Sequence, residues 1–306
     1  MKKNIIGLLA FSRHTDAPLR ERINTRFIDE IEKAGYEGEV LYYDLFSVFY
    51  KENKLEIYYN NKKFDAKKFL CVIPQYYFLN YQFANNAFIV TCLNQAGIKT
   101  FNSLEASHFA KNKRESLFLL AMKGLPIIPT GINFSQFFLD QHIKRNEGKK
   151  VVAKANLGSM GYGVSVLDSP ISFISFMEFM GATSQPVNTL IQPFVEAQGE
   201  DYRVFVVGRK VVAVMKRKAK GIEFRANVSK GGSAQSIRPS KKMIDLAVKA
   251  SNLLGLEYAG VDIVKVKNKL MIVEVNTNPG LEIERITGVN VVEKVIKHVI
   301  KKAKKK

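Results

Sequence analysis

The chain has few cysteines and histidines, and it has no long apolar run. Its two cysteines, Cys71 and Cys92, lie in apolar segments and show neither metal-ligand spacing nor a disulfide framework. This usage favours a reducing, cytoplasmic location. No apolar run approaches the roughly 20 residues of a membrane span. Ile5–Phe11 is better explained as a buried first strand than as a signal peptide, because no small-residue cleavage site follows it.

Acidic residues are scarce relative to basic ones. The chain has 47 Lys and Arg against 28 Asp and Glu, a net charge of +19, and seven lysines fall within the last thirteen residues. Such a charge favours anionic partners such as nucleotides, acidic peptides or ribosomal RNA, and it does not choose among them. A generally lysine-rich composition explains the excess equally well. Charge therefore narrows the class of partner without naming one.

Strand and helix patterns alternate in the first third of the chain. We expect strands at Ile5–Phe11, Glu39–Leu45 and Phe69–Ile73, and helices at Leu19–Ala34 and Ala87–Ala96, each helix closed by a glycine. This order predicts a small βαβ layer with a mostly parallel sheet. We assign it to a first domain of residues 1–101.

Mixed helix and strand patterns continue from Asn102 to the end. Ser103 is expected to cap a helix that runs to Lys123. Further strands are expected at Ile127–Gly131, Lys150–Ala155, Val164–Leu167, Thr189–Phe194, Tyr202–Val207 and Lys210–Met215, and helices at Ile171–Met180, Lys241–Leu254 and Val291–Ala303. The fold class is α/β with α+β lobes, divided at residues 102–188 and 189–306.

The segment Val261–Gly280 predicts a β-hairpin with two facing acids. Two apolar strands are joined by a short polar break, and symmetry about Asn268 would pair Asp262 with Glu274, Val264 with Ile272 and Val266 with Leu270. Asn276 shares a face with Glu274, because side chains two apart on a strand point the same way. Facing carboxylates repel unless a cation lies between them, and two carboxylates with an amide oxygen suit Mg²⁺. The alternative is a solvated hairpin face, but charge among valines and isoleucines is costly unless paired, which favours the metal.

Other charged positions are weaker signals when each is taken alone. Lys154 precedes a glycine-rich turn in VVAKANLGSMGYGV, where backbone N–H groups could approach phosphate, although a simple glycine hairpin turn explains the pattern equally well. Lys113 alone is typical of a surface lysine. Arg203 lies inside a strand and needs an anionic partner. The basic loop that begins at Lys216 is either solvated or a nucleic-acid patch.

In combination, these motifs resemble the ATP-grasp superfamily, and within it the RimK-type α-L-glutamate ligases. The resemblance is carried by VVAKANLGSMGYGV, EAQGEDYRVFVVGRKVVAVMKRKAKGIEFRANVSKGG, LEYAGVDIV and MIVEVNTNPGLE. It implies a preATP-grasp βαβ domain followed by two α+β lobes that hold ATP between them. The chain departs from the family at Gln192, Asn112 and Gln75, where Glu, Asp and Arg are usual.

The resemblance also implies roles for individual residues. Nucleotide contacts are expected from Lys113, Lys154, Gly158, Ser159, Met160, Gly161, Gly163, Gln192, Pro193, Asp201, Arg225, Ala226 and Asn227. Two Mg²⁺ or Mn²⁺ ions are expected on Asp262, Glu274 and Asn276, with Glu274 bridging them. Arg203, Arg217 and Arg225 are the expected catalytic arginines.

The reaction implied is ATP-dependent joining of a carboxylate and an amine through an acyl phosphate. The expected product is an amide, formed when L-glutamate is added to a protein C-terminus or to a glutamate chain. Expected partners are an amino acid and an acidic protein or peptide acceptor, with a ribosomal protein as one candidate, and the chain is expected to form a homo-oligomer. Two alternatives stay open: another amino acid with a small-molecule or carrier-protein acceptor, and a non-catalytic ribosome- or RNA-binding protein on the same fold.

Overall fold

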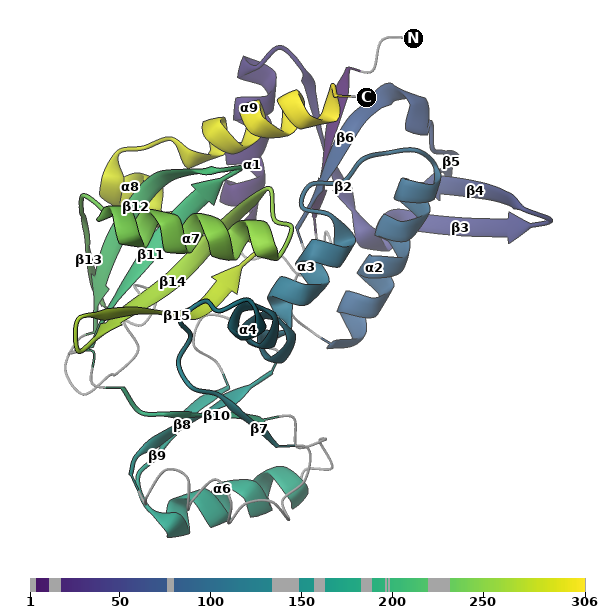
Figure 1. Ribbon diagram of the computed structural model, residues 1–306. Coiled ribbons are helices and arrows are strands. Elements are labelled where there is room, and N and C mark those ends of the chain that lie inside the picture. The colour runs from purple at the N-terminus through teal and green to yellow at the C-terminus, as the bar shows by residue number, and fades with distance from the viewer. Residues whose placement is uncertain are drawn as a thin grey trace.

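The computed structural model describes residues 4–10, 18–75, 80–133, 149–156, 163–182, 189–195, 197, 199–219 and 232–305. Four β-sheets lie in these ranges, with helices against them (Figure 1). No helix in the same ranges is long and apolar enough to cross a membrane.

The N-terminal part is the expected parallel layer. Strands β1 (Ile5–Ala10), β2 (Glu37–Tyr42) and β6 (Phe69–Pro74) form a parallel sheet in the order β2-β1-β6. Helix α1 (Pro18–Lys33) connects β1 to β2, and helix α2 (Asn80–Gln95) follows β6 and packs against the sheet. A second, antiparallel sheet of β3 (Phe46–Lys51), β4 (Lys54–Tyr59) and β5 (Lys62–Lys63) projects from the body as an arm. The sequence reasoning did not foresee this arm.

The helix expected from Ser103 to Lys123 is divided into two. Ser103 caps α3 (Leu104–Lys111), as predicted, and α4 (Lys113–Met122) follows directly. The break occurs at Asn112, whose backbone is extended (φ −83°, ψ 98°) and whose side chain caps α4. Lys113 is therefore the first residue of a helix and not a position in its middle.

A four-stranded sheet follows, with the order β7-β10-β8-β9. Its strands are β7 (Gly131–Asn133), β8 (Val151–Ala155), β9 (Val164–Leu167) and β10 (Thr189–Pro193), and α6 (Pro170–Ala182) covers one face. The strand expected at Ile127–Gly131 is displaced, because Ile127 instead forms a bridge with Ile272. The segment before β7 thus tethers this sheet to the next one.

The largest sheet has five strands in the order β13-β12-β11-β14-β15. They are β11 (Glu200–Val207), β12 (Lys210–Lys218), β13 (Ser233–Ser236), β14 (Tyr258–Val266) and β15 (Lys269–Asn276). Helix α7 (Lys241–Leu253) covers one face, and α8 (Glu282–Thr287) and α9 (Val291–Ala303) lie on the other. The amphipathic α9 matches its predicted bounds.

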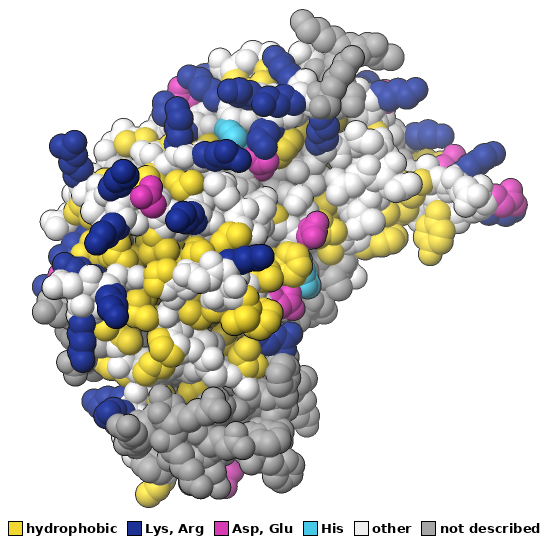
Figure 2. All heavy atoms as spheres, in the orientation of Figure 1, with side chains coloured by type: hydrophobic (Ala, Val, Ile, Leu, Met, Phe, Trp, Pro, Cys, Tyr) yellow, Lys and Arg dark blue, Asp and Glu magenta, His cyan; other side chains and the backbone are white. Residues whose placement is uncertain are grey.

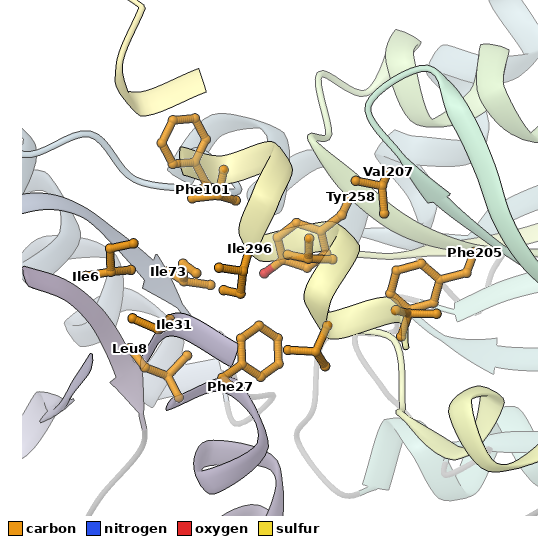
Figure 3. Close-up of a cluster of buried hydrophobic side chains, with 14 of the residues drawn as sticks. Ile6, Leu8, Phe27, Ile31, Ile73, Phe101, Phe205, Val207, Tyr258 and Ile296 are labelled. Atoms are coloured by element: carbon orange, nitrogen blue, oxygen red, sulfur yellow. The ribbon is translucent and has the colours of Figure 1, made fainter. Parts of the chain in front are cut away.

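One hydrophobic cluster joins the N-terminal layer to the five-stranded sheet. Ile6 and Ile73 of the parallel sheet and Phe205 and Tyr258 of the five-stranded sheet belong to it, and Ile296 of α9 lies between them (Figure 3). All five are at most 2% exposed. Helix α9 therefore fixes the two sheets against each other by burying its apolar face between them.

Candidate active site

Two acidic side chains meet on the hairpin of β14 and β15. Asp262 is paired directly with Glu274, as predicted. Asn276 Nδ2 donates a hydrogen bond to Glu274 Oε1 at 3.1 Å, so these two side chains share a face as expected. The side chain of Asp262 is 4% exposed and that of Glu274 is 28% exposed. The hairpin thus brings two carboxylates and one amide together.

The other pairs expected for this hairpin are wrong. Ile263 pairs with Ile272, Val264 with Met271 and Val266 with Lys269. The turn has two residues and not three, and both Lys267 and Asn268 have positive φ (44° and 66°). Val273 has no opposite residue and forms a β-bulge. The bulge shifts the register by one residue and so restores the pairing of the two acids.

Two arginines surround the carboxylate of Asp262. Arg203 Nε and Nη2 donate to its two oxygens at 2.6 and 2.7 Å, and Arg217 Nη2 lies 3.0 Å from Oδ2. Arg217 also donates two hydrogen bonds of 2.6 and 2.7 Å to Asp201. Arg203 lies directly across from Asp262 in the sheet, and Asp201 lies across from Arg217. Asp262 is therefore the anionic partner that Arg203 requires inside its strand.

The arginines decide the charge of Asp262. Burial alone would raise the pKa of this carboxyl group, but Arg203 and Arg217 outweigh burial and hold the pKa well below its usual range. The group is therefore ionised at neutral pH. Three of the roughly four acceptor positions of its oxygens are taken by the arginines, which leaves about one for another ligand.

Two lysines approach the acids from outside the five-stranded sheet. Lys113 Nζ, on α4, lies 3.9 Å from Glu274 Oε2. Lys154, near the end of β8, has its pKa lowered to about 8, because removal of its ammonium group from water outweighs attraction by Glu274, and Lys113 lowers the pKa further. The structure thus brings together Lys113, Lys154, Asp262 and Glu274, which the sequence placed far apart.

The start of α4 is tied to the end of β8, which positions both lysines. The backbone N–H of Lys113 donates to the Asn156 carbonyl oxygen at 3.3 Å, and the N–H of Arg114 donates to Asn156 Oδ1 at 3.0 Å. Asn156 is buried. Sequence reasoning missed it, and its only signal was a short amide side chain directly after a strand whose penultimate residue is a candidate lysine.

Asn102 is a second residue that sequence reasoning did not assign. Its Nδ2 donates to the carbonyl oxygens of Tyr258 and Thr277 at 2.9 and 3.3 Å. Its Oδ1 accepts from the N–H groups of Glu257 and Tyr258 at 2.7 and 3.2 Å. This one amide therefore holds the beginning of β14 and the segment just after β15, and so positions the hairpin that carries the acids.

Other predicted nucleotide contacts are only partly described. Gly163 has φ +69°, and a Cβ there would lie 2.8 Å from Ala155 Cβ, so glycine is required where β9 begins. Gln192 is buried and its Nε2 donates to Thr130 Oγ1 at 2.9 Å, and Pro193 ends β10. The predicted residues Gly158, Ser159, Met160, Gly161, Arg225, Ala226 and Asn227 lie outside the described ranges.

The donor atoms of the hairpin fit a hard cation. Among the described residues no three His, Cys, Asp or Glu side chains are grouped around a common point. Asp262, Glu274 and Asn276 instead offer two carboxylates and one amide, all oxygen ligands of the kind that Mg²⁺ prefers. The remaining acceptor position of Asp262 and the partly exposed Glu274 are compatible with such an ion.

The architecture is shared with solved ATP-grasp ligases. The D-cycloserine synthetase DcsG has a TM-score of 0.75 over 98% of this chain and 100% of its own, at 15% identity. The ligase PsnB in complex with a minimal precursor has a TM-score of 0.74 over 98% and 99%, at 18% identity. A RimK domain protein from Sphaerobacter thermophilus DSM 20745 has 0.71 over 96% and 98%, at 16% identity. The fold is therefore that of an ATP-grasp ligase.

Sequence comparison defines the family within this class. The RimK-like ATP-grasp domain model matches residues 110–299. A probable alpha-L-glutamate ligase of Legionella pneumophila (strain Corby) is 39% identical over 210 residues, which are 68% of this chain and 69% of the relative. A probable alpha-L-glutamate ligase of Vibrio parahaemolyticus is 39% identical over 219 residues, which are 71% of this chain and 72% of the relative. The chain belongs to the RimK-like ATP-grasp family and is an ATP-grasp ligase.

Proposed function

We propose that this ligase adds L-glutamate to the C-terminus of a protein or to a growing glutamate chain, with ATP and Mg²⁺. The single observation that carries the proposal is the meeting of Lys113 and Lys154 with Asp262 and Glu274, which places cations for phosphate beside oxygen ligands for a metal. The names of the relatives support glutamate as the amino acid. The solved complex of PsnB with a precursor supports a peptide acceptor.

In the proposed reaction a substrate carboxylate attacks the γ-phosphate of ATP and releases ADP. An amine then attacks the resulting acyl phosphate, forms an amide and releases phosphate. Lys154 and Lys113 would bind the phosphates, and Arg203 and Arg217 would stabilise the negative charge that develops, because fixed cations in a partly dry site act without reorganising. Arg225 is the third arginine that we propose to stabilise this negative charge.

The metal is proposed to bind to Asp262, Glu274 and Asn276. It would offset the negative charge of the phosphates during transfer. Two ions, with Glu274 between them and with Mn²⁺ as a substitute, stay a prediction.

Further assignments belong to the same proposal. Asp201 would contact the ribose, although it also anchors Arg217, and Gln192 and Pro193 would line the adenine site through their backbones. Domains of residues 1–101, 102–188 and 189–306 and a homo-oligomer stay predictions as well. Free, buried thiols at Cys71 and Cys92 fit a reducing cytoplasm.

The test is mass spectrometry of candidate acceptors after incubation with ATP, Mg²⁺ and single amino acids. We expect peptides that end in glutamate to gain glutamate residues and to release ADP. Glu274→Ala, which removes a partly exposed metal ligand, should abolish both products while keeping the parent's circular dichroism spectrum. Transfer of a different amino acid, or modification of only a small-molecule or carrier-protein acceptor, would refute glutamate ligation. RNA binding without ADP release in any mixture would favour a non-catalytic protein.

A further inference from the structure

A second concave region lies at the far end of the five-stranded sheet from Asp262. A cavity of about 510 Å³ opens between the β11–β12 turn, the segment that joins α7 to β14 and the end of α9. Its ionisable lining residues are Arg209, Glu257, His298, Lys301, Lys302 and Lys305. Lys and Arg side chains gather on the surface over α9 (Figure 2). This cavity takes no part in the proposed reaction.

The only carboxylate among these lining residues is already neutralised. His298 Nε2 lies 2.6 Å from Glu257 Oε2, and Lys302 Nζ lies 2.8 Å from Oε1. The hydrogen bond to His298 is the largest influence on Glu257 and lowers its pKa. Glu257 therefore stays ionised and holds His298 and Lys302 along the wall, and both of its oxygens are engaged.

Three further cations have no such partner. Arg209, Lys301 and Lys305 are exposed, and none of them forms an ion pair with a carboxylate of the described ranges. They come from two separate elements, the β11–β12 turn and α9. Like charges converge here on one hollow, and the positive potential that they create attracts an anion.

In the wall of the cavity, the backbone at Gly208 packs closely against the side chain of His298. Gly208 has φ +58°, and a Cβ at this position would lie 2.6 Å from His298 Cε1. The Gly208 N–H donates to the Glu257 carbonyl oxygen at 2.7 Å. Backbone and imidazole therefore meet at a distance that only glycine permits, and the contact fixes His298 in the wall.

We propose that this cavity binds the acidic segment of the peptide acceptor, a run of carboxylates on the substrate or on the lengthening product. This choice of ligand rests on the proposed function, since glutamate addition makes its product more acidic at each step. The described lining residues include no Phe, Tyr or Trp on which a base could stack, and the one aromatic ring, the imidazole of His298, is held by Glu257, which disfavours single-stranded nucleic acid. Leu256 is its one large apolar residue.

The strand geometry sets the spacing between the two sites. Glu257 lies directly before β14 and five residues before Asp262, and a strand advances by about 3.3 Å per residue, so the sites lie about 17 Å apart along the sheet. An extended peptide would need at least about five residues to span this distance. Because β14 is buried from Tyr258 to Val264, the peptide would have to pass around the sheet, so an acceptor held in the cavity would need more than about five residues between its bound carboxylates and its reacting terminus.

The experiment compares two triple variants that remove the same charge. Arg209→Gln/Lys301→Gln/Lys305→Gln empties the cavity of its unpaired cations, and the control Lys241→Gln/Lys242→Gln/Lys249→Gln removes three exposed lysines from α7. Binding of a fluorescent peptide of about eight glutamates is measured by anisotropy, without ATP. We expect about tenfold weaker binding for the cavity variant, since three exposed ion pairs with the peptide are lost and each contributes modestly. The control should bind as the parent does.

Several outcomes would overturn the proposal. They are absence of peptide binding by the parent, equal weakening in both variants, and tighter binding of an oligonucleotide that the cavity variant loses. Because binding is measured without turnover, the two proposals fail separately. A chain that binds the peptide through these residues but ligates nothing contradicts only the proposed function. A glutamate ligase whose cavity variant binds the peptide like the parent contradicts only the cavity.

Discussion

Asp262 and Glu274 face each other across two strands, and cations from three elements make this arrangement stable. Arg203 and Arg217 hold Asp262, and Lys113 lies near Glu274. Removing either arginine would leave buried charge unpaired, which costs several kcal/mol in other proteins. The acids are therefore best tested at Glu274, which is partly exposed, and the arginines are poor targets for a clean functional test.

Lys154 is the residue whose loss should most directly weaken nucleotide binding. Lys154→Met removes the ammonium group and keeps much of the aliphatic stem, so we expect ATP affinity to fall about 10- to 100-fold, the usual contribution of a charged hydrogen bond. Calorimetric titration with ATP and Mg²⁺ measures the change. Lys150→Met, at an exposed lysine just before the same strand, is the matched control and should bind ATP as the parent does. Equal affinities in the two variants would show that Lys154 does not bind phosphate.

The side chains that could be predicted are those whose chemistry is unusual for their place in the sequence. A carboxylate or an arginine inside an apolar strand is costly without a partner, so Asp262 and Arg203 attract notice. Asn102 and Asn156 are ordinary amides in ordinary positions. Their importance lies in hydrogen bonds to segments 156 and 42 positions away, which only the folded chain brings near.

At the scale of elements, the hairpin of β14 and β15 depends on Asn102. Asn102→Ala would leave two N–H groups and two carbonyl oxygens without their partner in a buried place. We expect a loss of about 3 kcal/mol in the free energy of unfolding, with weaker metal-dependent activity in the folded fraction. Urea denaturation measures the first effect. Asn252→Ala, at an exposed asparagine of α7, should change stability by less than about 0.5 kcal/mol. A similar small change for Asn102→Ala would mean that the hairpin is held by packing alone.

Tight turns explain which strands escaped prediction. The projecting arm turns at Glu52-Asn53 and again at Asn60-Asn61, and all four residues have positive φ without being glycine. The usual Asn-Gly or Asp-Gly signal of such turns is missing. The Lys267-Asn268 turn is of the same kind, so the three-residue break and the symmetric pairing about Asn268 predicted for that hairpin are both wrong near the turn. The extra residue Val273 forms a bulge that shifts the register by one, so Asp262 still pairs with Glu274 as predicted. Long amphipathic helices such as α9 carry a periodic signal and were predicted well.

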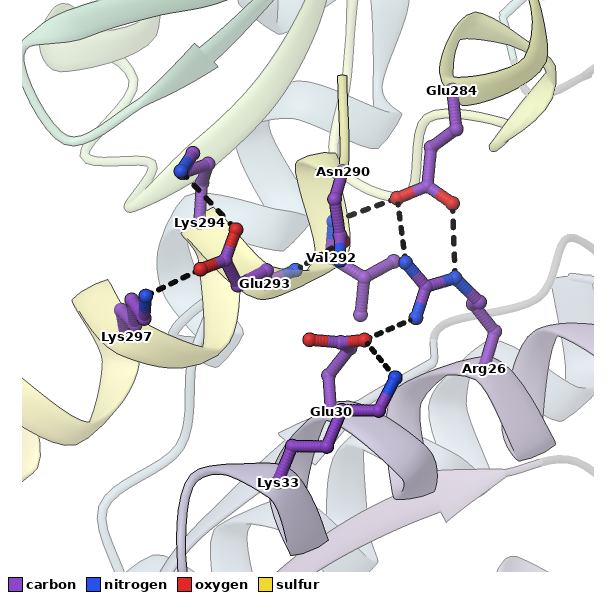
Figure 4. A network of polar contacts seen from close by, with 9 residues as sticks. All are labelled: Arg26, Glu30, Lys33, Glu284, Asn290, Val292, Glu293, Lys294 and Lys297. Atoms are coloured by element: carbon purple, nitrogen blue, oxygen red, sulfur yellow. Dashed lines mark hydrogen bonds and ion pairs between the residues drawn. The ribbon is translucent and has the colours of Figure 1, made fainter. Parts of the chain in front are cut away.

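At the scale of the whole molecule, a charged network joins the first helix to the last two. Arg26 of α1 donates to Glu30 at 2.7 Å and to Glu284 of α8 at 3.1 Å, and Glu284 also accepts from the Val292 N–H of α9 at 3.1 Å (Figure 4). Lys33 donates to Glu30 at 2.9 Å. Together with the cluster around Ile296, this network couples the N-terminal layer to the sheet that carries the acids.

The network should make stability depend on acid pH. Burial alone would raise the pKa of Glu30, but hydrogen bonds from Arg26 and Lys33 outweigh it and lower the pKa from 4.5 to about 2. The folded protein thus binds this proton less readily than the unfolded chain. The stabilisation is complete above pH 4.5 and is lost as the pH falls toward 2.

Urea unfolding at pH 6 and pH 3 tests this dependence. Glu30→Gln should be less stable than the parent at pH 6, and the difference should shrink at pH 3. Glu32→Gln, at an exposed position of the same helix, should match the parent at both values. A difference between Glu30→Gln and the parent that does not change with pH would assign the role of Glu30 to packing.

The arginine pairs around Asp262 also bear on when the metal is needed. A buried acidic cluster without internal counter-ions would fold only after capturing a cation, and chelators would then unfold the protein. Here Arg203 and Arg217 already balance Asp262. The chain is therefore expected to reach its folded state without a metal, and the proposed magnesium would bind afterwards. A shortage of the ion in the cell would then stop catalysis without unfolding the protein and exposing it to proteases.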